Sequence, residues 1–390
     1  RIRLTVVAAA SLTTAAAVME SLVPPKIDRP PANRPSTDER TAMFAGDANQ
    51  MDKPMHMARL LSWALADLML AYPEIVVAGE DVGPKGGVYN VTAKLHQRFG
   101  SARVINTLLD EQAILGLAIG MAHNGFVPMP EIQFLAYVHN AEDQIRGEAA
   151  TLSFFSNGQY TNPMVIRIAG LGYQKGFGGH FHNDNSLAVF RDIPGVILAV
   201  PSNGRDAVQM LRECVRLARE EQRVVVFVEP IALYMTRDLH EEGDGLWTSA
   251  YEAPGEGTPI RLGDVGVHGD GTDLAIVTYG NGTYLSRQAE KLLAADGVKA
   301  RVIDLRWLGP VDADKLVAAV GEAKRVLIVD ECRITGSQSE ALMALFTERT
   351  PEKTLARIAA EDSFIPLGKA ATVTLPSRDS IYAAAKELLA

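Results

Sequence analysis

Cysteine is scarce in this chain of 390 residues, which contains only Cys214 and Cys332. The two lie far apart, one in an expected helix and one at an expected strand end, so they do not form the framework of a disulfide-rich protein. We therefore expect two buried thiols and a protein of the reducing cytoplasm.

Long hydrophobic runs and blocks of basic residues are also absent from the sequence. No stretch of roughly 18 or more strongly apolar residues occurs, so a membrane-spanning helix is not expected. The formal net charge is -9, which argues against binding to nucleic acid or to an anionic membrane surface. Apolar residues make up 47% of the chain, which is enough for the cores of two or three globular domains.

The first 54 residues differ from the rest of the chain. Residues 1–22 hold two arginines and then a weakly apolar run rich in alanine and threonine, which lacks the leucine-rich core of a signal peptide. Six prolines lie between Pro24 and Pro54, a composition typical of a semi-rigid, largely extended linker without a core. We interpret residues 1–54 as the tail of something longer followed by this linker, with a signal peptide or an unrelated leader as alternatives.

From Met57 onward, short apolar strands alternate with helices. The segment Met57–Tyr72 has apolar residues at helical spacing and predicts a helix with one buried stripe. Strands are expected at Glu74–Ala78 and Met129–Gln133, and a helix at Asn140–Phe155. This alternation, which resumes at Thr272 after an irregular acidic stretch, predicts an α/β protein with two parallel-sheet domains. The expected domains are residues 55–235 and 271–390, with a connector at 236–270.

The stretch from Arg103 to Gly158 carries the most unusual pattern. One acid, Glu111, begins an almost wholly apolar segment with Gly116 and Gly120. No amphipathic stripe is visible, so this segment predicts a helix buried on all sides, and glycines four apart allow another backbone or a flat ligand to approach. A carboxylate at the mouth of such a helix is costly unless it has a function there. The alternative is an acid that satisfies free helix amides, a role that suits the neighbouring Asp110 better.

Several segments resemble the beta half of the E1 component of 2-oxo acid dehydrogenase complexes, a thiamine-diphosphate decarboxylase of the transketolase superfamily. The segments are LLDEQAILGLAIGMAHNG, PEIQFLAYVHNAEDQI, AGEDVGPKGGVYNVTAKLHQRFG and GGHFHNDNSLAVFRDIPGVILAVPSN. The resemblance covers residues 57–389 and implies a transketolase-like pyrimidine-binding domain and a transketolase C-terminal domain. It also implies oxidative decarboxylation of a 2-oxo acid, with transfer of the acyl group to a lipoyl group on a partner acyltransferase, E2.

The resemblance assigns roles to particular residues. Glu111 would contact N1′ of the aminopyrimidine of thiamine diphosphate and favour the tautomer whose 4′-nitrogen removes the C2 proton, while the cofactor supplies the electron sink. Phe134 would lie against the pyrimidine ring, and Tyr137 and Leu109 would line the same cavity. His182 would exchange protons near the substrate carbonyl or the lipoyl sulfur. Two core aromatics at helical spacing are the alternative for Phe134 and Tyr137.

This chain departs from the family pattern around the histidine. The family usually carries His-Ser-Gln where this chain has His182-Asn183-Asp184, and His180 is an additional histidine. Either histidine could act, and the resemblance favours His182. A metal pair formed by the two is a weaker alternative, because no cluster of Cys, Asp or Glu completes it. For the loop that begins at Glu80, which resembles the family's E-D-V-G loop, we expect a role in subunit packing.

The sequence holds only half of a cofactor site. Thiamine enzymes bind Mg2+ and diphosphate through a Gly-Asp-Gly motif with an Asn-Asn partner, whereas Gly243–Gly245 and Gly269–Gly271 lack that partner and indicate turns. We therefore expect no metal ligands in this chain. An E1 alpha subunit or alpha half would hold the Mg2+ and diphosphate. The expected assembly is a heterotetramer of two alpha and two beta subunits, or a homodimer of a fused chain in which residues 1–54 end the alpha half.

The substrate side chain cannot be inferred from these residues. Pyruvate and branched-chain 2-oxo acids fit the sequence almost equally well as substrates, and the proline-rich tail slightly favours a branched-chain substrate. One alternative is another transketolase-superfamily enzyme, against which the EIQF block and the absence of basic sugar-phosphate clusters argue. The other is a non-catalytic subunit that only binds E2, against which the presence of Glu111 and His182 argues.

Overall fold

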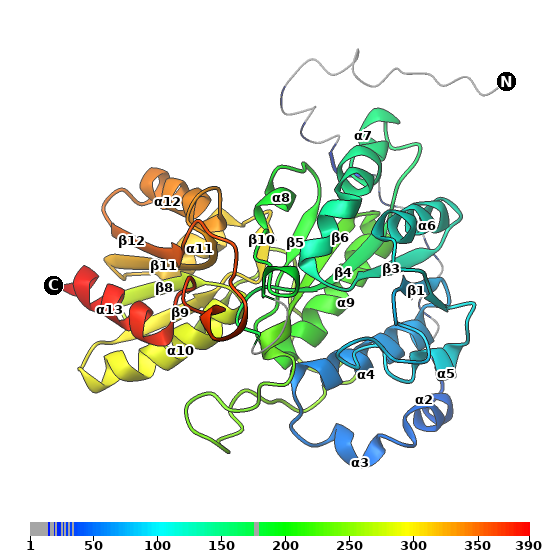
Figure 1. Ribbon diagram of the computed structural model, residues 1–390, viewed down its shortest axis with the longest axis horizontal. Helices are drawn as coiled ribbons and strands as arrows, with labels where there is room; N and C mark the ends of the chain where they lie inside the picture. The colour runs from blue at the N-terminus through cyan, green and yellow to red at the C-terminus, as the bar shows by residue number, and fades with distance from the viewer. Residues whose placement is uncertain are drawn as a thin grey trace.

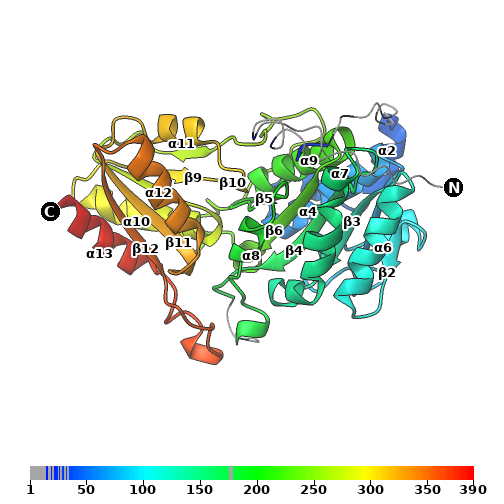
Figure 2. The ribbon, with the colours of Figure 1, turned by 90° about the horizontal axis from the view of Figure 1, so that it is seen from above.

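Two sheets organise the computed structural model, and each is built mainly from one half of the chain (Figure 1). The structure describes residues 35–174 and 179–390, together with Ala15, Met19, residues 22–24, Lys26, Arg29 and Ala32. In the view from above, the two sheets with their helices lie side by side (Figure 2). The predicted α/β class with two mainly parallel sheets is confirmed.

The first sheet has the strand order β10-β5-β6-β4-β3-β1-β2. Its strands are β1 (Ile75–Gly79), β2 (Val104–Asn106), β3 (Val127–Ile132), β4 (Met164–Gly170), β5 (Ile197–Ala199), β6 (Val224–Pro230) and β10 (Trp307–Gly309). Neighbouring strands run parallel except β10, which pairs antiparallel with β5. Because β10 comes from the second half of the chain, the two halves share this sheet.

The second sheet has the strand order β12-β11-β8-β9-β7. Its strands are β7 (Gly266–His268), β8 (Leu274–Thr278), β9 (Ala300–Asp304), β11 (Arg325–Arg333) and β12 (Thr354–Ala360). All pairs are parallel except β7 with β9. β8 and the middle of β11 are completely buried, as expected for parallel strands with helices on both faces.

Helices cover both faces of each sheet (Figures 1 and 2). The α-helices of the described residues are α2 (Thr37–Phe44), α3 (Ala48–Met51), α4 (Met57–Ala71), α5 (Leu95–Phe99), α6 (Glu111–His123), α7 (Leu152–Phe155), α8 (Ala188–Arg191), α9 (Gly204–Glu221), α10 (Gly280–Ala295), α11 (Ala313–Val320), α12 (Gln338–Arg349) and α13 (Arg378–Leu389). Five short helical turns complete the elements of these residues: η1 (Leu135–Ala141), η2 (Gln144–Ala149), η3 (Gly179–Phe181), η4 (Ile231–Leu233) and η5 (Gly368–Ala370).

Helix α4 is buried on almost every side, so the prediction of a single buried stripe is wrong. It packs against α9 and the first sheet, and other segments cover what remains. Its polar residue Asp67 is buried and accepts hydrogen bonds from Arg40 of α2 (2.8 Å) and from the hydroxyl of Tyr251 (2.6 Å). The helical periodicity did not show these outer neighbours because they come from distant parts of the chain.

Residues 37–51 form helices α2 and α3, so the prediction of an extended linker up to residue 54 is wrong in this part. Phe44 is only 3% exposed and joins the core of the first sheet. Asp47 is buried and forms ion pairs with Lys94 and Arg98, both at 2.7 Å. The prolines that suggested a linker lie before and after this segment, which itself contains none. Most of the predicted tail at residues 1–22 lies outside the described residues.

The predicted helix Asn140–Phe155 is not continuous. A 3-10 turn (η1), a π turn (η2) and the short α7 take its place. Side chains satisfy carbonyl groups around the π turn, since Thr151 donates to the carbonyl of Gly147 (2.7 Å) and Asn162 donates to that of Glu148 (3.3 Å). Such side-chain hydrogen bonds compete with a regular helical ladder, and they were not visible from apolar spacing.

Helix α6 is buried on one side only, so the prediction that it is buried on all sides is wrong for this chain. Its buried residues are Glu111, Ile114, Leu115, Ala118 and Ala122. On the other side Leu117 is 39% exposed, and a side chain added at Gly116 or Gly120 would meet no atom within 4 Å. The outer face is therefore apolar and open to solvent, as is typical of a surface that receives another chain.

Candidate active site

Glu111 lies at the first position of α6, where the chain turns from β2 into the helix. Asp110 is the N-cap, and its carboxylate accepts a hydrogen bond from the amide of Ala113 (3.1 Å). Glu111 is therefore not needed as a cap, and its side chain is buried instead. Its Oε2 accepts a hydrogen bond from Nδ2 of Asn140 in η1 (3.2 Å). This contact fixes the orientation of the carboxylate, and it could not be predicted from local sequence because the two residues lie on different elements.

Other ionisable groups lie close to Glu111. Burial raises the pKa of the Glu80 carboxyl, and the neighbouring carboxylates of Asp81 and Glu111 raise it further. Burial also raises the pKa of Tyr137, and the negative charges of Glu80 and Glu111 add to this effect. The loop after β1 thus contributes an acid to the site, whereas the sequence suggested only a packing role for it. A cluster of acids favours a ligand that brings hydrogen-bond donors or a basic nitrogen.

The structure brings Phe134, Tyr137 and His182 together. The ring of Phe134 is buried, and the rings of Tyr137 and His182 meet it edge to face, at centroid distances of 5.7 and 4.5 Å. Tyr89 also contacts Phe134 edge to face, at 6.3 Å. Tyr89 was not among the predicted site residues, although it lies in one of the segments that resemble the family.

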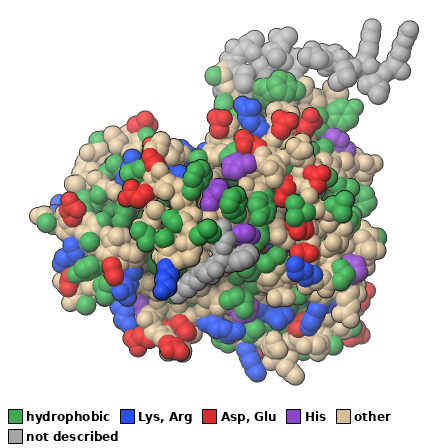
Figure 3. Space-filling view, viewed as in Figure 1, with side chains coloured by type: hydrophobic (Ala, Val, Ile, Leu, Met, Phe, Trp, Pro, Cys, Tyr) green, Lys and Arg blue, Asp and Glu red, His purple; other side chains and the backbone are tan. Residues whose placement is uncertain are grey.

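The two histidines of the glycine-rich loop have different neighbours. His182 lies against Phe134, whereas the ring of His180 lies 4.7 Å from that of Phe364, in the loop after β12. Nδ1 of His180 also lies 3.7 Å from the buried carboxylate of Asp184. Histidine side chains gather near the middle of the face shown in Figure 3, between the two halves of the molecule. Of the two, His182 lies with the aromatic residues predicted to contact the cofactor.

Leu109, unlike Phe134, is not buried within this chain. It is 66% exposed, and the preceding Leu108 is 86% exposed. Both leucines are in the loop that leads to Asp110 and Glu111, next to the open face of α6. A buried acid thus lies beside an exposed apolar edge. This arrangement fits a flat, partly apolar heterocycle with a basic nitrogen, which the acid would contact.

Within the described residues, no group of three or more His, Cys, Asp or Glu side chains is placed to hold a metal ion. Asp244, in one of the two Gly-Asp-Gly motifs, accepts hydrogen bonds from four backbone N–H groups at distances of 2.7 to 3.0 Å. Although desolvation acts to raise it, these four groups hold the pKa of Asp244 well below its usual range. Its carboxylate stabilises a turn of the connector.

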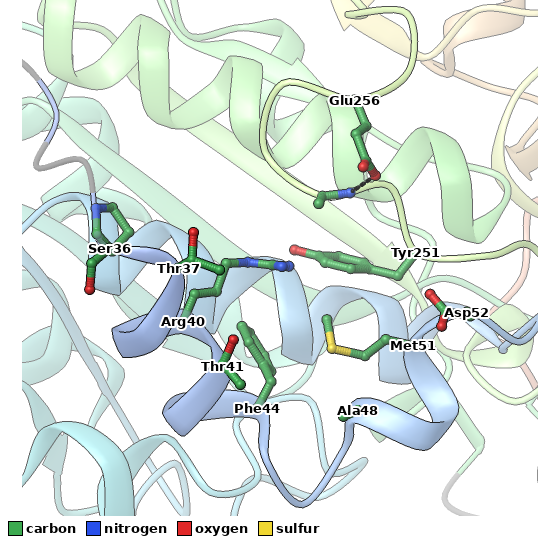
Figure 4. Close-up of a pocket in the computed structure, with 12 residues that line it drawn as sticks. Ser36, Thr37, Arg40, Thr41, Phe44, Ala48, Met51, Asp52, Tyr251 and Glu256 are labelled. Atoms are coloured by element: carbon green, nitrogen blue, oxygen red, sulfur yellow. Dashed lines mark hydrogen bonds between the residues drawn. The ribbon is translucent and has the colours of Figure 1, made fainter.

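A cavity of about 440 Å³ lies between α2, α3 and the connector, and Figure 4 shows its lining. Arg40 extends into it above the ring of Phe44, at 5.1 Å from the ring centroid, and points toward Tyr251. Arg40 is also bonded to Asp67, so its charge is already compensated. None of the residues predicted for the active site lines this cavity.

Comparison with known proteins supports the assignment of the two halves. The model of the transketolase pyrimidine-binding domain matches residues 53–236, and that of the transketolase C-terminal domain matches residues 263–379. The chain is 33% identical over 343 residues to the beta subunit of the pyruvate dehydrogenase E1 component of Bacillus subtilis, which covers 86% of this chain and 98% of that relative. The same subunit of Staphylococcus aureus is 34% identical, with the same coverage.

Solved structures show the same fold at lower identity. An inactive beta4 tetramer of a split-gene transketolase matches with a TM-score of 0.66 and 20% identity, over 86% of this chain and 98% of that chain. A transketolase variant from Pichia stipitis matches with a TM-score of 0.61 and 17% identity, over 87% of this chain and 46% of that chain. Among the described residues, no helix has the length and apolar character needed to cross a membrane.

Proposed function

This chain belongs to the family of beta subunits of the E1 component of 2-oxo acid dehydrogenases, and we propose that Glu111 and His182 are its catalytic residues. The observation that carries this proposal is the buried carboxylate of Glu111, whose charge raises the pKa of Tyr137, together with the contacts of the Tyr137 and His182 rings with Phe134. The reaction is the oxidative decarboxylation of a 2-oxo acid, followed by transfer of the acyl group to a lipoyl group of E2.

Each residue of the site has a distinct task in this proposal. Thiamine diphosphate supplies the electron sink when it is bound. Glu111 holds a proton at N1′ of the aminopyrimidine, and the hydrogen bond from Asn140 keeps its carboxylate in place. Phe134 and Leu109 would contact the aminopyrimidine ring and exclude water from it, and Tyr137 would line the same cavity. His182 moves a proton at the substrate carbonyl or at the lipoyl sulfur.

An E1 alpha subunit completes the site. The apolar face formed by Leu108, Leu109 and the outer side of α6 is exposed next to Glu111, and a partner chain would bury it. We propose that the alpha subunit binds there and carries the Mg2+ and the diphosphate, because the acids of this chain near Glu111 repel a diphosphate rather than bind it.

The substrate is tested by a decarboxylation assay of the chain assembled with its alpha subunit. We expect pyruvate to react fastest, because relatives that are 33% and 34% identical are named for pyruvate. The branched-chain 2-oxoisovalerate is the alternative that the proline-rich tail favours, and 2-oxoglutarate should be a poor substrate. Comparable rates with 2-oxoglutarate, or no decarboxylation of any 2-oxo acid, would contradict the proposed reaction.

Cofactor affinity tests the division of the site between two subunits. Calorimetry with the chain alone should detect weak binding of thiamine diphosphate that changes little on addition of Mg2+, because the described residues provide no metal site. Addition of the alpha subunit should make binding tight and sensitive to removal of Mg2+ by a chelator. Tight, Mg2+-dependent binding by the isolated chain would contradict the division.

A further inference from the structure

The loop between β4 and α8 includes His182, and the structure describes it at residues 171–174 and 179–187. Its two ends are held together, because the amide of Leu171 donates to the carbonyl of Asp184 (2.9 Å). Farther along, the amide of Gln174 donates to Oδ1 of Asn183 (2.8 Å). The position of His182 is thus tied to the base of this loop.

The base of the loop lies against the half of the molecule that is built on the second sheet. Leu171 and Tyr173 have positive φ angles of 70° and 69°, in the left-handed region that side chains disfavour. Gly172 lies between them, and a Cβ atom added there would come within 2.7 Å of Leu375. The hydroxyl of Tyr173 donates to the carbonyl of Pro376 (2.8 Å). A disfavoured backbone of this kind persists only where surrounding contacts fix it.

Glu331 on β11 provides contacts to both ends of the loop. Its side chain is buried, and the residue is only 1% exposed. Oε2 accepts a hydrogen bond from the amide of Gly172 (3.2 Å), and the backbone carbonyl accepts one from Nδ2 of Asn185 (2.8 Å). The carboxylate also accepts hydrogen bonds from the amide (3.1 Å) and the side chain (2.9 Å) of Asn281, at the start of α10. One residue therefore joins the second sheet, α10 and the loop.

We infer that Glu331 is a positioning residue, which holds the loop so that His182 lies against Phe134 in the active site. This inference rests on the proposed role of His182. Burial raises the pKa of the Glu331 carboxyl to about 8, against the opposing effect of the hydrogen bonds from Asn281 and Gly172. An acid is unfavourable at such a place unless its acceptor oxygens are required, and three N–H groups donate to them: the amide of Gly172 and both the amide and the side chain of Asn281.

The Glu331→Gln variant, assembled with the alpha subunit, tests this inference. Glutamine keeps the volume of the side chain, but its amide group would direct N–H bonds toward the N–H donors of Gly172 or Asn281. The hydrogen bond to one of these two residues should therefore be lost. Decarboxylation and acyl transfer should slow by roughly 10- to 10²-fold, as expected when a catalytic group is displaced by about 1 Å. Exchange of the C2 proton of thiamine diphosphate, which depends on Glu111, should stay within about threefold of the wild-type rate. Amide hydrogen exchange at residues 183–186 should become faster.

Asp330→Asn is the matched control. Asp330 is also a buried acid of β11, but it accepts hydrogen bonds from Tyr279, Cys332 and Ser339, which all belong to the second half of the chain. This variant should lower the melting temperature without a selective loss of acyl transfer. If Glu331→Gln does not fold, Asn185→Leu removes the hydrogen bond to the carbonyl of Glu331 alone, and a smaller loss at the same step is expected.

Combination with His182→Ala decides whether Glu331 acts through the histidine. The double variant should be about as slow as His182→Ala alone, because the same catalytic contribution is lost in both. The inference would be overturned if the losses of the two single variants multiply in the double variant. It would also be overturned if Glu331→Gln slows C2 proton exchange and acyl transfer equally, or leaves amide exchange in the loop unchanged. A fully active His182→Ala enzyme would instead refute the proposed role of His182. The amide exchange does not depend on that role, because it measures only how firmly the loop is held.

Discussion

The Glu111→Gln variant is expected to lose exchange of the C2 proton of bound thiamine diphosphate, and with it every later step. The loss should be at least roughly 10²- to 10⁴-fold, the contribution of a well-placed acid–base group. Glutamine can still accept the hydrogen bond from Asn140, so the geometry should persist. It has no carboxylate to hold a proton at N1′. Proton NMR of the exchange in the assembled enzyme, with cofactor binding measured by calorimetry, gives the result.

Asp110→Asn provides the matched control for this prediction. Asp110 is the neighbouring acid, and asparagine is an equally good N-cap for α6. This variant should therefore exchange the C2 proton at a nearly normal rate. Full activity of Glu111→Gln would support the alternative that the chain is a non-catalytic subunit that only binds E2. Equal losses in both variants would indicate damage to the helix start.

The sequence predicted the main elements of the fold because their signals are local. Helix α9 illustrates this, since Asn203, directly before its first residue Gly204, is its N-cap. The side chain of Asn203 accepts a hydrogen bond from the amide of Asp206 (3.0 Å), and the cap, the helical periodicity and the end of the helix all lie within one stretch.

Burial was harder to predict, because it depends on partners that are distant in sequence. Helix α4 has a polar residue at Asp67 and a clear apolar stripe, yet Arg40 and Tyr251 cover its outer side. Helix α6 is apolar from Ala113 to Ala122, yet among the described residues only one of its sides is buried. An apolar outer face indicates that a surface will be buried, but not whether the same chain or another one buries it.

The candidate site shows the same limit. The resemblance pointed to Glu111, Phe134 and His182 because their neighbouring residues resemble the family's motifs. Glu80 follows β1 and Asn140 lies after β3, and these two strands are neighbours in the sheet. The order of the strands therefore brings Glu80 and Asn140 to the site, although they are far apart in sequence. Nothing in the local sequence of Asn140 indicates that it donates a hydrogen bond to Glu111.

The His182→Ala variant is expected to separate the second catalytic residue from the first. It should bind thiamine diphosphate and exchange the C2 proton at a nearly normal rate, because Glu111 and Asn140 are untouched. Decarboxylation, or reductive acylation of the lipoyl domain, should fall by roughly 10²- to 10⁴-fold if the imidazole is a general acid–base group. Rapid-mixing measurements of each step, beside the proton exchange, locate the loss.

His180→Ala is the control that distinguishes the two histidines. His180 contacts Phe364 and lies near Asp184, away from the aromatic residues around Phe134, so its removal should leave acyl transfer within about threefold of the wild-type rate. A large loss in His180→Ala with a normal His182→Ala enzyme would exchange their roles. Abolished C2 proton exchange in His182→Ala, with cofactor still bound, would mean that the histidine acts on the cofactor itself. In that case the division of labour with Glu111 would be wrong, since a residue that acts after proton removal cannot control its rate.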